Sequence, residues 1–420
     1  MHPRPTCLRE TFQRGHVSAQ FEWGETDLAG RHLTVVSSFY RDEIVSGENL
    51  AVTAQTEALR NAGARVQFVQ RSTDMMRNQP GYRALSAFRV ATGINLPRTQ
   101  IVEDRESQDI LLVHNLFPNF GSRIVKHWGG PIVVMVHNYR YLCSNGLFFR
   151  EGKTCTKCIE GNSAHAMRYA CYRDSRLATL PLAAATWNSV QRNPILELAD
   201  QIICQSQRAS SLFLKAGIEP GRISTVIGFA PGAVQGAAES DTREQRDRWL
   251  FVGRLTAEKG LLELLNEWPA FENLDVVGDG PETHVIGMGK PTSVHFLGRK
   301  SHEWVLENIE RYKGLIYPGL CFEGAVPMVV REAVSRGVPV LAARDTSASD
   351  FVDAHGVGTT YVPEIGQLST ALNRMQENYE EYARNAKGTA RTLLSQESWI
   401  RSMAKVFDKA SERFMLRPRS

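Results

Sequence analysis

The segment that decides the fold class is Trp249-Leu-Phe-Val-Gly-Arg-Leu-Thr-Ala-Glu-Lys-Gly-Leu-Leu-Glu-Leu-Leu265. It reads as a short apolar strand, a turn bounded by glycines and the start of an amphipathic helix. Similar units recur along the chain, beginning with a strand expected at His32–Ser38 and a helix expected at Glu48–Ala62. This alternation is typical of βαβ units, so the sequence predicts an α/β fold with parallel sheets.

Length, composition and charge limit the kinds of protein that this chain encodes. Its 420 residues allow two or three domains of roughly 150 residues each. With 42% hydrophobic and 22% charged residues, it is neither collagen-like, coiled-coil nor wholly disordered. The net charge of +4 is too small to indicate nucleic-acid binding. Because we find neither a long apolar run nor the apolar core of a signal peptide, we expect a cytoplasmic protein.

Gly228–Arg246 lacks hydrophobic periodicity and is therefore expected to link two α/β halves. The predicted organisation is a polar N-terminal extension (1–30), a Rossmann-like domain (31–228) with a cysteine-rich insertion (139–176), a linker (229–247), a second Rossmann-like domain (248–395) and a C-terminal helix (396–420).

Two cations follow the strand of the second half. Arg254 and Lys259 lie where ligands bind in open α/β sheets, beyond the carboxyl end of a strand. Cations beside a helix N-terminus are unfavourable unless an anion compensates them. The pair therefore suits a diphosphate, and the alternative is a solvated helix terminus.

A second strand end, after Tyr317, carries two glutamates and a glycine loop. We expect Pro327 to be the first residue of the following helix. Three amides would point toward a ligand, those of Gly324, Ala325 and Val326. Carboxylates accept bonds from hydroxyls, so Glu323 suits a sugar and Glu332 a ribose. Alternatively, Glu323 caps the helix and Glu332 lies on its solvent face.

A third glycine turn, Val277-Gly-Asp-Gly-Pro281, follows another expected strand. Taken alone it is a weak signal, because such turns are common. Together with the other two segments, it could form a wall for a nucleotide base from Gly278, Gly280 and Arg299.

These three segments, in this order and spacing, resemble retaining glycosyltransferases of family 4, which have the GT-B fold. The first half is similar to the same family at Ser46–Asn49, Val113–Phe117 and Val136–Arg140. The resemblance covers about residues 33–415.

The resemblance implies two Rossmann-like domains that face each other across a cleft, with the last helix crossing back to the first domain. It implies a hexosyltransferase that moves a sugar from a UDP- or GDP-sugar to a saccharide acceptor without a catalytic metal. Similar enzymes build bacterial surface polysaccharides on lipid carriers, so a lipid-linked acceptor and peripheral contact with the inner face of the membrane are implied. No nucleic-acid partner is implied.

The resemblance also assigns roles to single residues. Arg254 and Lys259 would hold the diphosphate, and His137 and Glu323 would contact the donor sugar, with Glu332 on the ribose. For His137 the alternative is a structural histidine bonded to backbone. The implied donor-binding positions are Gly47, Gly253, Gly278, Gly280, Arg299, Gly324, Ala325, Val326 and Glu332.

One departure from the family concerns the two glutamates. Eight residues separate Glu323 from Glu332, where the family usually has seven. We expect the loop to bulge in order to absorb the extra residue. The departure keeps a rival function open, a catalytically silent GT-B-like protein that binds a nucleotide-sugar. A GT-B epimerase or hydrolase is a further alternative, which the paired glutamates and the two cations disfavour.

Four cysteines lie close together in the sequence: Cys143, Cys155, Cys158 and Cys171. Four thiolates suit a tetrahedral structural zinc ion, and a subset of family 4 has a similar insertion. Free thiols, a disulfide and an iron–sulfur cluster are the alternatives. Since the insertion follows His137, we expect it on the acceptor side.

Arg71–Arg98 mixes arginines with apolar residues. Such a basic amphipathic stretch can lie on an anionic membrane, which would suit a lipid-linked acceptor. The alternative is a surface helix of the first domain.

Overall fold

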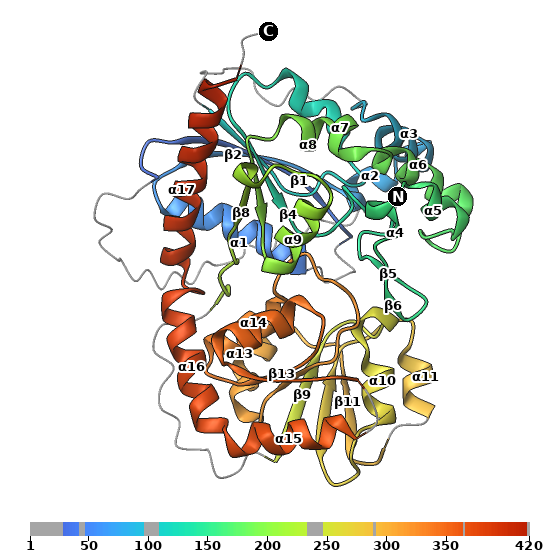
Figure 1. The fold of residues 1–420 in the computed structure, drawn as a ribbon, viewed down its shortest axis with the longest axis vertical. Helices are drawn as coiled ribbons and strands as arrows, with labels where there is room; N and C mark the ends of the chain where they lie inside the picture. The colour runs from blue at the N-terminus through green and yellow to red at the C-terminus, as the bar shows by residue number, and fades with distance from the viewer. Residues whose placement is uncertain are drawn as a thin grey trace, which may run out of the picture.

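The computed structural model consists of two lobes stacked along the long axis of the molecule (Figure 1). It describes residues 28–41, 47–95, 109–232, 247–288, 291–363 and 366–417. Most of the expected N-terminal extension and most of the expected linker lie outside these residues, as do Ser46 and Arg98.

The first lobe contains a six-stranded parallel sheet with the order β2-β1-β3-β4-β7-β8. Its strands are β1 (His32–Phe39), β2 (Arg65–Ser72), β3 (Ile110–Val113), β4 (Ile132–Val136), β7 (Gln201–Cys204) and β8 (Ile223–Thr225). Every residue of β3 and β4 is buried, as expected for strands covered on both faces. Helices α1 (Gly47–Asn61) and α9 (Gln207–Lys215) begin just after β1 and β7.

The second lobe contains another six-stranded parallel sheet with the order β11-β10-β9-β12-β13-β14. Its strands are β9 (Arg248–Val252), β10 (Asn273–Val277), β11 (Val294–Gly298), β12 (Leu315–Tyr317), β13 (Val340–Ala343) and β14 (Gly358–Tyr361). The connecting helices include α10 (Leu261–Asn266), α11 (Thr283–Met288), α12 (His302–Asn308), α13 (Met328–Ser335), α14 (Ser347–His355) and α15 (Gln367–Glu377). The sequence does not predict β14, because its Gly-Thr-Thr-Tyr residues have little apolar character.

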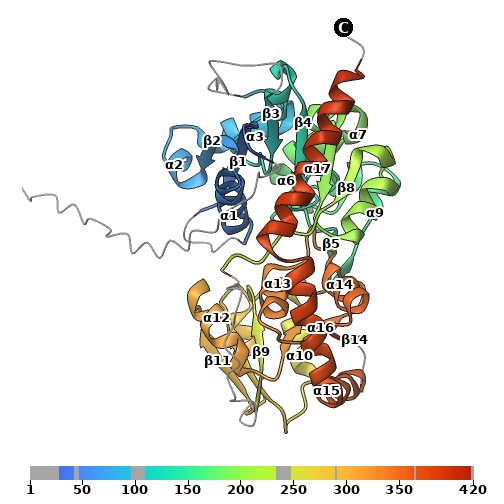
Figure 2. The ribbon, with the colours of Figure 1, turned by 90° about the vertical axis from the view of Figure 1, so that its left-hand side faces the viewer.

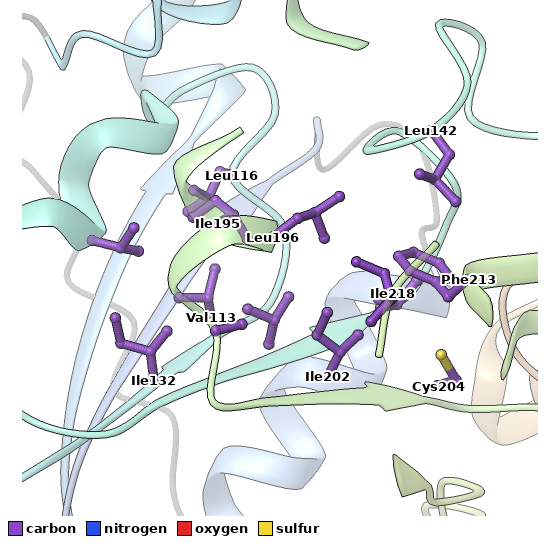
Figure 3. Packing of buried hydrophobic residues seen from close by; sticks show 14 of the residues in the cluster. Val113, Leu116, Ile132, Leu142, Ile195, Leu196, Ile202, Cys204, Phe213 and Ile218 are labelled. Atoms are coloured by element: carbon purple, nitrogen blue, oxygen red, sulfur yellow. The ribbon is translucent and has the colours of Figure 1, made fainter. Parts of the chain in front are cut away.

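Both faces of the first sheet are covered by apolar side chains. On one face, Val113, Ile132 and Ile202 of the sheet pack with Phe213 of α9 (Figure 3). On the other face, Trp399 and other side chains of α17 (Gln396–Met415) pack against sheet residues such as Val35. In Figure 2, α16 (Tyr379–Thr392) lies along the second lobe and α17 continues along the first. The last helix therefore crosses back to the first sheet.

The segment between β4 and β7 forms a small substructure of its own. It comprises a two-stranded hairpin and five short helices: β5 (Phe149–Arg150), β6 (Lys153–Thr154), α4 (Lys157–Glu160), α5 (Ala164–Arg168), α6 (Arg176–Thr186), α7 (Ser189–Arg192) and α8 (Pro194–Leu198). Tyr139 and Phe148 are buried against each other, with ring centroids 4.7 Å apart. An aromatic pair thus anchors the start of the insertion to the first lobe.

The basic stretch from Arg71 forms two helices, α2 (Thr73–Arg77) and α3 (Tyr82–Thr92), separated at Gly81. The side chain of Arg89 is fully buried, so this arginine does not belong to a solvated or membrane-facing stripe. Helix α3 packs against α6 of the insertion. None of the helices in the described residues has both the length and the apolar character needed to cross a membrane.

Candidate functional site

The two sheets approach each other through the loops at the carboxyl ends of their strands. Gln205, directly after β7, forms a parallel β-bridge with Ala325, and its carbonyl accepts a hydrogen bond from the Val326 amide at 3.2 Å. Gly324 fits against the backbone of His137, since a Cβ at Gly324 would lie 2.5 Å from the His137 carbonyl oxygen. The loop after β12 is therefore held against the first lobe.

This bridge changes two expectations about the glycine loop. The Val326 amide bonds to Gln205 and so does not point toward a ligand, because the domain contact uses it. Pro327 is the N-cap of α13, and the helix starts one residue later at Met328. The eight residues between Glu323 and Glu332 are thus accommodated while the loop after β12 is bridged to the first lobe.

Lys259 and Glu323, from separate loops of the second lobe, form one ion pair. Lys259 Nζ donates to Glu323 Oε1 at 2.5 Å and to the Tyr317 hydroxyl at 3.2 Å. Burial alone would lower the pKa of Lys259. The attraction of the neighbouring Glu323 carboxylate outweighs this effect, so the pKa of Lys259 is raised and the amine stays charged. Lys259, which is expected to bind the diphosphate, and Glu323, which is expected to bind the sugar, are therefore in direct contact.

The turn that carries Lys259 depends on a glycine. Gly260 has φ of +67°, and a Cβ there would lie 2.1 Å from the Pro318 carbonyl oxygen. Only glycine lets this turn approach the loop after β12 so closely. Arg254, at the start of the same turn, is 54% exposed and pairs with Glu258 at 3.2 Å. Lys259 and Arg254 thus both follow β9. The lysine is half-buried, whereas the arginine is exposed to solvent.

The glycines expected to form a wall for a nucleotide base let loops pack together. Gly278 has φ of +144°, and a Cβ there would lie 1.8 Å from the Gly253 carbonyl oxygen. A Cβ at Gly280 would lie 2.4 Å from the Leu255 carbonyl oxygen. Arg299 is exposed directly after β11. The structure therefore brings the loops after β9, β10 and β11 together, with Arg299 at their edge.

Glu332 points into the protein. It is 3% exposed, and its Oε1 lies 2.7 Å from His302 Nε2, which excludes a position on the solvent face of α13. The hydrogen bond to Glu332 raises the pKa of His302. The neighbouring Arg331 is also buried and donates to the backbone carbonyl oxygens of Val326 and Phe229. These contacts fix the start of α13.

His137 is the centre of a hydrogen-bonded chain in the first lobe. Gln205 Nε2 lies 3.1 Å from the Val136 carbonyl oxygen, so this end of the side chain is the donor. The same nitrogen lies 3.1 Å from His137 Nδ1, which must accept. Burial lowers the pKa of His137 to about 3, so the ring is neutral and carries its proton on Nε2.

The chain continues to a second histidine that the sequence analysis did not single out. His137 Nε2 donates to His114 Nδ1 at 2.8 Å, which leaves the proton of the neutral His114 ring on Nε2. No described residue accepts from His114 Nε2, although the atom is buried. Both ring nitrogens of His137 are thus bonded within the protein, and its contact with the donor sugar stays a prediction.

Gly47 begins α1 at the contact between the lobes, and a Cβ there would lie 3.9 Å from Met328 Cε. The next residue, Glu48, accepts from Asn138 Nδ2 at 3.2 Å, and its Oε1 is buried with no described partner. Burial raises the pKa of Glu48 to about 7. The first lobe thus places a carboxyl group that titrates near neutrality beside the residues that follow β4.

Side chains from both lobes fix the backbone of Glu323. Its carbonyl oxygen accepts from the Tyr139 hydroxyl of the first lobe at 2.8 Å and from Ser347 Oγ of the second at 2.6 Å. Nearby, Arg208 and Asp350 form a two-pronged ion pair between the lobes, with distances of 2.8 and 2.6 Å. The sequence carried no signal for Ser347, Arg208 or Asp350, because the role of each depends on how the lobes pack.

The four clustered cysteines lie near one another in the insertion. Burial, together with the charges of Cys143, Cys171 and Cys155, raises the pKa of Cys158 to about 12. Among the described residues, however, no three or more His, Cys, Asp or Glu side chains are arranged to hold a metal ion. The thiols are neighbours without a ligating geometry.

Comparison with known proteins agrees with this architecture. Residues 246–378 match the family model described as "Glycosyl transferases group 1", a range that contains Arg254, Lys259, Glu323 and Glu332. No curated protein matches the chain by sequence.

Solved structures resemble almost the whole chain. HepE of Anabaena in complex with UDP-glucose has a TM-score of 0.58 at 16% identity, covering 90% of this chain and 99% of that one. The sucrose-phosphate synthase of Thermosynechococcus elongatus has a TM-score of 0.58 at 15% identity, covering 90% and 98%. WaaG, a glycosyltransferase involved in lipopolysaccharide biosynthesis, has a TM-score of 0.57 at 17% identity, covering 89% and 99%. The fold is therefore GT-B, as the sequence predicted.

Proposed function

We propose that the protein is a glycosyltransferase that moves a sugar from a nucleotide diphosphate-sugar to a saccharide acceptor. The observation that carries the proposal is the Lys259–Glu323 pair, held where the loops of the two sheets meet. It is supported by the glycosyltransferase family model over the second lobe and by the UDP-glucose bound to the structurally similar HepE.

In the proposed reaction, the donor diphosphate takes over Lys259 from Glu323 and recruits the exposed Arg254. The two cations then stabilise the negative charge that develops on the departing nucleotide diphosphate. Glu323, released from the lysine, accepts hydrogen bonds from the hydroxyls of the donor sugar. Glu332 lies near the ribose, and its bond with His302 orients the carboxylate.

The proposed transfer is of the hexosyltransferase type and retains the anomeric configuration, as the motif resemblance implies. We assign no side chain as a nucleophile. The proposed setting is bacterial surface polysaccharide synthesis at the inner face of the membrane, on a lipid-linked acceptor. One of the similar structures, WaaG, is described as involved in lipopolysaccharide biosynthesis.

The experiment that tests this function is release of UDP or GDP from a panel of nucleotide-sugars, with and without saccharide acceptors. Release that requires an acceptor supports the transferase. Release with water alone contradicts it in favour of a hydrolase.

A second candidate function is a catalytically silent nucleotide-sugar-binding protein. The observation that favours it is the Val326 amide, which a ligand cannot use while it bonds to Gln205. Thermal stabilisation by nucleotide-sugars without any release of the nucleotide would support this second candidate.

We further propose that the four clustered cysteines hold a structural zinc ion. The support is the sequence, which places four cysteines between Cys143 and Cys171 and so offers the ligand set that tetrahedral zinc prefers. Metal analysis of the full chain should find stoichiometric zinc, which Cys158→Ser should abolish. Cys321→Ser, at a buried cysteine of the other lobe, should leave the zinc in place. Zinc-free wild-type protein would overturn the proposal.

A further inference from the structure

His114 is a buried histidine with one ring nitrogen that the protein leaves without a partner. The residue is 1% exposed, and its Nε2 atom bonds to nothing among the residues that the structure describes. Buried polar atoms in proteins nearly always have a hydrogen-bond partner, and an exception needs a reason. A ligand that supplies the missing partner is such a reason.

The hydrogen-bonded chain through His137 decides that this nitrogen is a donor. Gln205 Nε2 donates to the Val136 carbonyl oxygen, so the same amide group also donates to His137 Nδ1. His137 therefore carries its proton on Nε2 and donates it to His114 Nδ1 at 2.8 Å. Burial lowers the pKa of both histidines, so both rings are neutral and the proton of His114 is on Nε2.

This donor belongs to the wall of a cavity. His114 and His137 both line a cavity of about 900 Å³ in the first lobe, and their ring centroids lie 5.1 Å apart. Because His137 already occupies Nδ1 of His114, Nε2 is the ring nitrogen that remains for a ligand in this cavity. The group that completes the site must be a hydrogen-bond acceptor, such as an oxygen atom.

The histidines adjoin the loop of the second lobe that carries Glu323. A Cβ at Gly324 would lie 2.5 Å from the His137 carbonyl oxygen, and the Gln205 carbonyl accepts from the Val326 amide. The carboxylate of Glu323 can only accept hydrogen bonds, whereas the neutral His114 ring offers only a donor. A sugar bound beside this loop would meet an acceptor from the second lobe and a donor from the first.

We propose that His114 is a further sugar-binding residue, which donates from Nε2 to an oxygen of the transferred sugar. Gln205 and His137 are positioning residues that direct its proton. Since a hydroxyl group both accepts and donates, sugar hydroxyls can satisfy His114 and Glu323 together. This inference rests on the proposed glycosyl transfer and adds a residue to which the sequence motifs assign no role.

The first test isolates the contribution of the sugar to donor binding. Calorimetry on the full chain gives the ratio of the dissociation constants of UDP and UDP-glucose, and likewise of GDP and GDP-mannose. For the pair that binds, His114→Asn should lower the ratio by about fivefold or more and leave the affinity for the nucleotide diphosphate unchanged. The shorter amide replaces Nδ1 of His114 but does not reach the position of Nε2.

Two further variants and a control complete this test. His114→Gln, whose longer amide reaches the position of Nε2, should restore most of the ratio. His114→Phe, which keeps a ring of similar shape without its nitrogens, should show the same loss as His114→Asn. His355→Gln, at the end of α14 in the second lobe, should leave the ratio unchanged. An unchanged ratio in His114→Asn and His114→Phe would overturn the proposal, and so would equal weakening of nucleotide and nucleotide-sugar.

The second test locates the protons without any ligand. Nitrogen NMR of the full chain with isotope-labelled histidine distinguishes a protonated ring nitrogen from a bare one, and His114→Asn identifies the signals of His114. The wild-type protein should have His114 protonated on Nε2. In Gln205→Glu a carboxyl oxygen can accept from His137 Nδ1, so both rings should reverse and leave His114 Nε2 bare. A proton that stays on Nε2 in this variant would overturn the positioning role of Gln205.

Failure of this inference is distinguishable from failure of the proposed function. Thermal stabilisation by UDP and GDP is measured on the same proteins, and His114→Asn should keep it. Nucleotide stabilisation together with an unchanged ratio in His114→Asn rejects the role of His114 alone. A wild-type protein that binds none of the four nucleotide probes rejects the donor function, and the role of His114 with it.

Discussion

Lys259 and Glu323, 64 positions apart in the sequence, meet at 2.5 Å between two loops of the second lobe. The lysine is 23% exposed and the glutamate 14%, so the pair is only partly screened by water. Without a ligand the carboxylate neutralises the lysine, and a diphosphate is a stronger partner for the same ammonium group. In the proposed reaction, donor binding is therefore coupled to the release of Glu323.

Lys259→Ala should reduce sugar transfer by about a hundredfold or more, because it removes charge that stabilises the departing diphosphate. Arg254→Ala should also lose most of the transfer, since it acts on the same charge. The measurement is the rate of nucleotide diphosphate release at saturating donor. Lys405→Ala, at an exposed lysine on α17, is the control and should keep the wild-type rate. Near-normal turnover in both site variants would remove the central proposal.

Arg208→Ala should weaken the contact between the lobes. The guanidinium of Arg208 binds both carboxylate oxygens of Asp350, and the two side chains are 22% and 37% exposed. Because both side chains are partly solvated, we expect their coupling in the free energy of unfolding to be about 1 kcal/mol, measured in a double-mutant cycle with Asp350→Asn. The expected structural change is a larger radius of gyration in X-ray scattering. Additive single effects would mean that the pair does not hold the lobes together.

The sequence predicted the two sheets well, because buried parallel strands are nearly continuous apolar runs. The strand expected at His32–Ser38, for example, is observed at His32–Phe39. The strand Gly358–Tyr361 was missed, since its polar residues lack that pattern. Similarly, no local pattern predicts that the Val326 amide donates to Gln205 or that His114 accepts a hydrogen bond from His137. Such contacts arise only when segments distant in sequence pack together.

His302→Gln should lower stability at acidic pH and have little effect at alkaline pH. Hydrogen bonding to Glu332 raises the pKa of His302, so the folded state holds this proton more tightly than the unfolded state. The stabilisation is complete below the unfolded pKa of about 6.5 and disappears as the pH rises through the folded pKa. Melting temperatures at about pH 5.5 and about pH 9 measure the difference.

His355 provides a control of opposite sign. Burial lowers its pKa, so the unfolded state binds its proton more readily and stability falls with decreasing pH. His355→Gln should therefore reduce the loss of melting temperature on acidification. The interpretation of His302 fails if both variants respond to pH in the same direction.

Gly278→Ala should destabilise the second lobe far more than Gly298→Ala. Both glycines have positive φ, but a Cβ at Gly298 meets no atom within 4 Å, whereas one at Gly278 lies 1.8 Å from the Gly253 carbonyl oxygen. We expect Gly298→Ala to lower the free energy of unfolding by about 1 kcal/mol, from backbone strain alone. Gly278→Ala should lower the free energy of unfolding by more than about 3 kcal/mol, because the loops after β9 and β10 must separate. Denaturant unfolding measures both, and similar losses would contradict the close packing of these loops.

Helix α17 has a consequence for how the chain is made. Its Trp399, Met403 and Phe407 complete the apolar core on one face of the first sheet, whose last strand ends at Thr225. A ribosome therefore releases the whole first sheet, and then the whole second lobe, before the helix that covers this face exists. Until then the nascent chain exposes Val35, Leu112 and their neighbours to water, which makes it a natural client for chaperones that bind apolar surface.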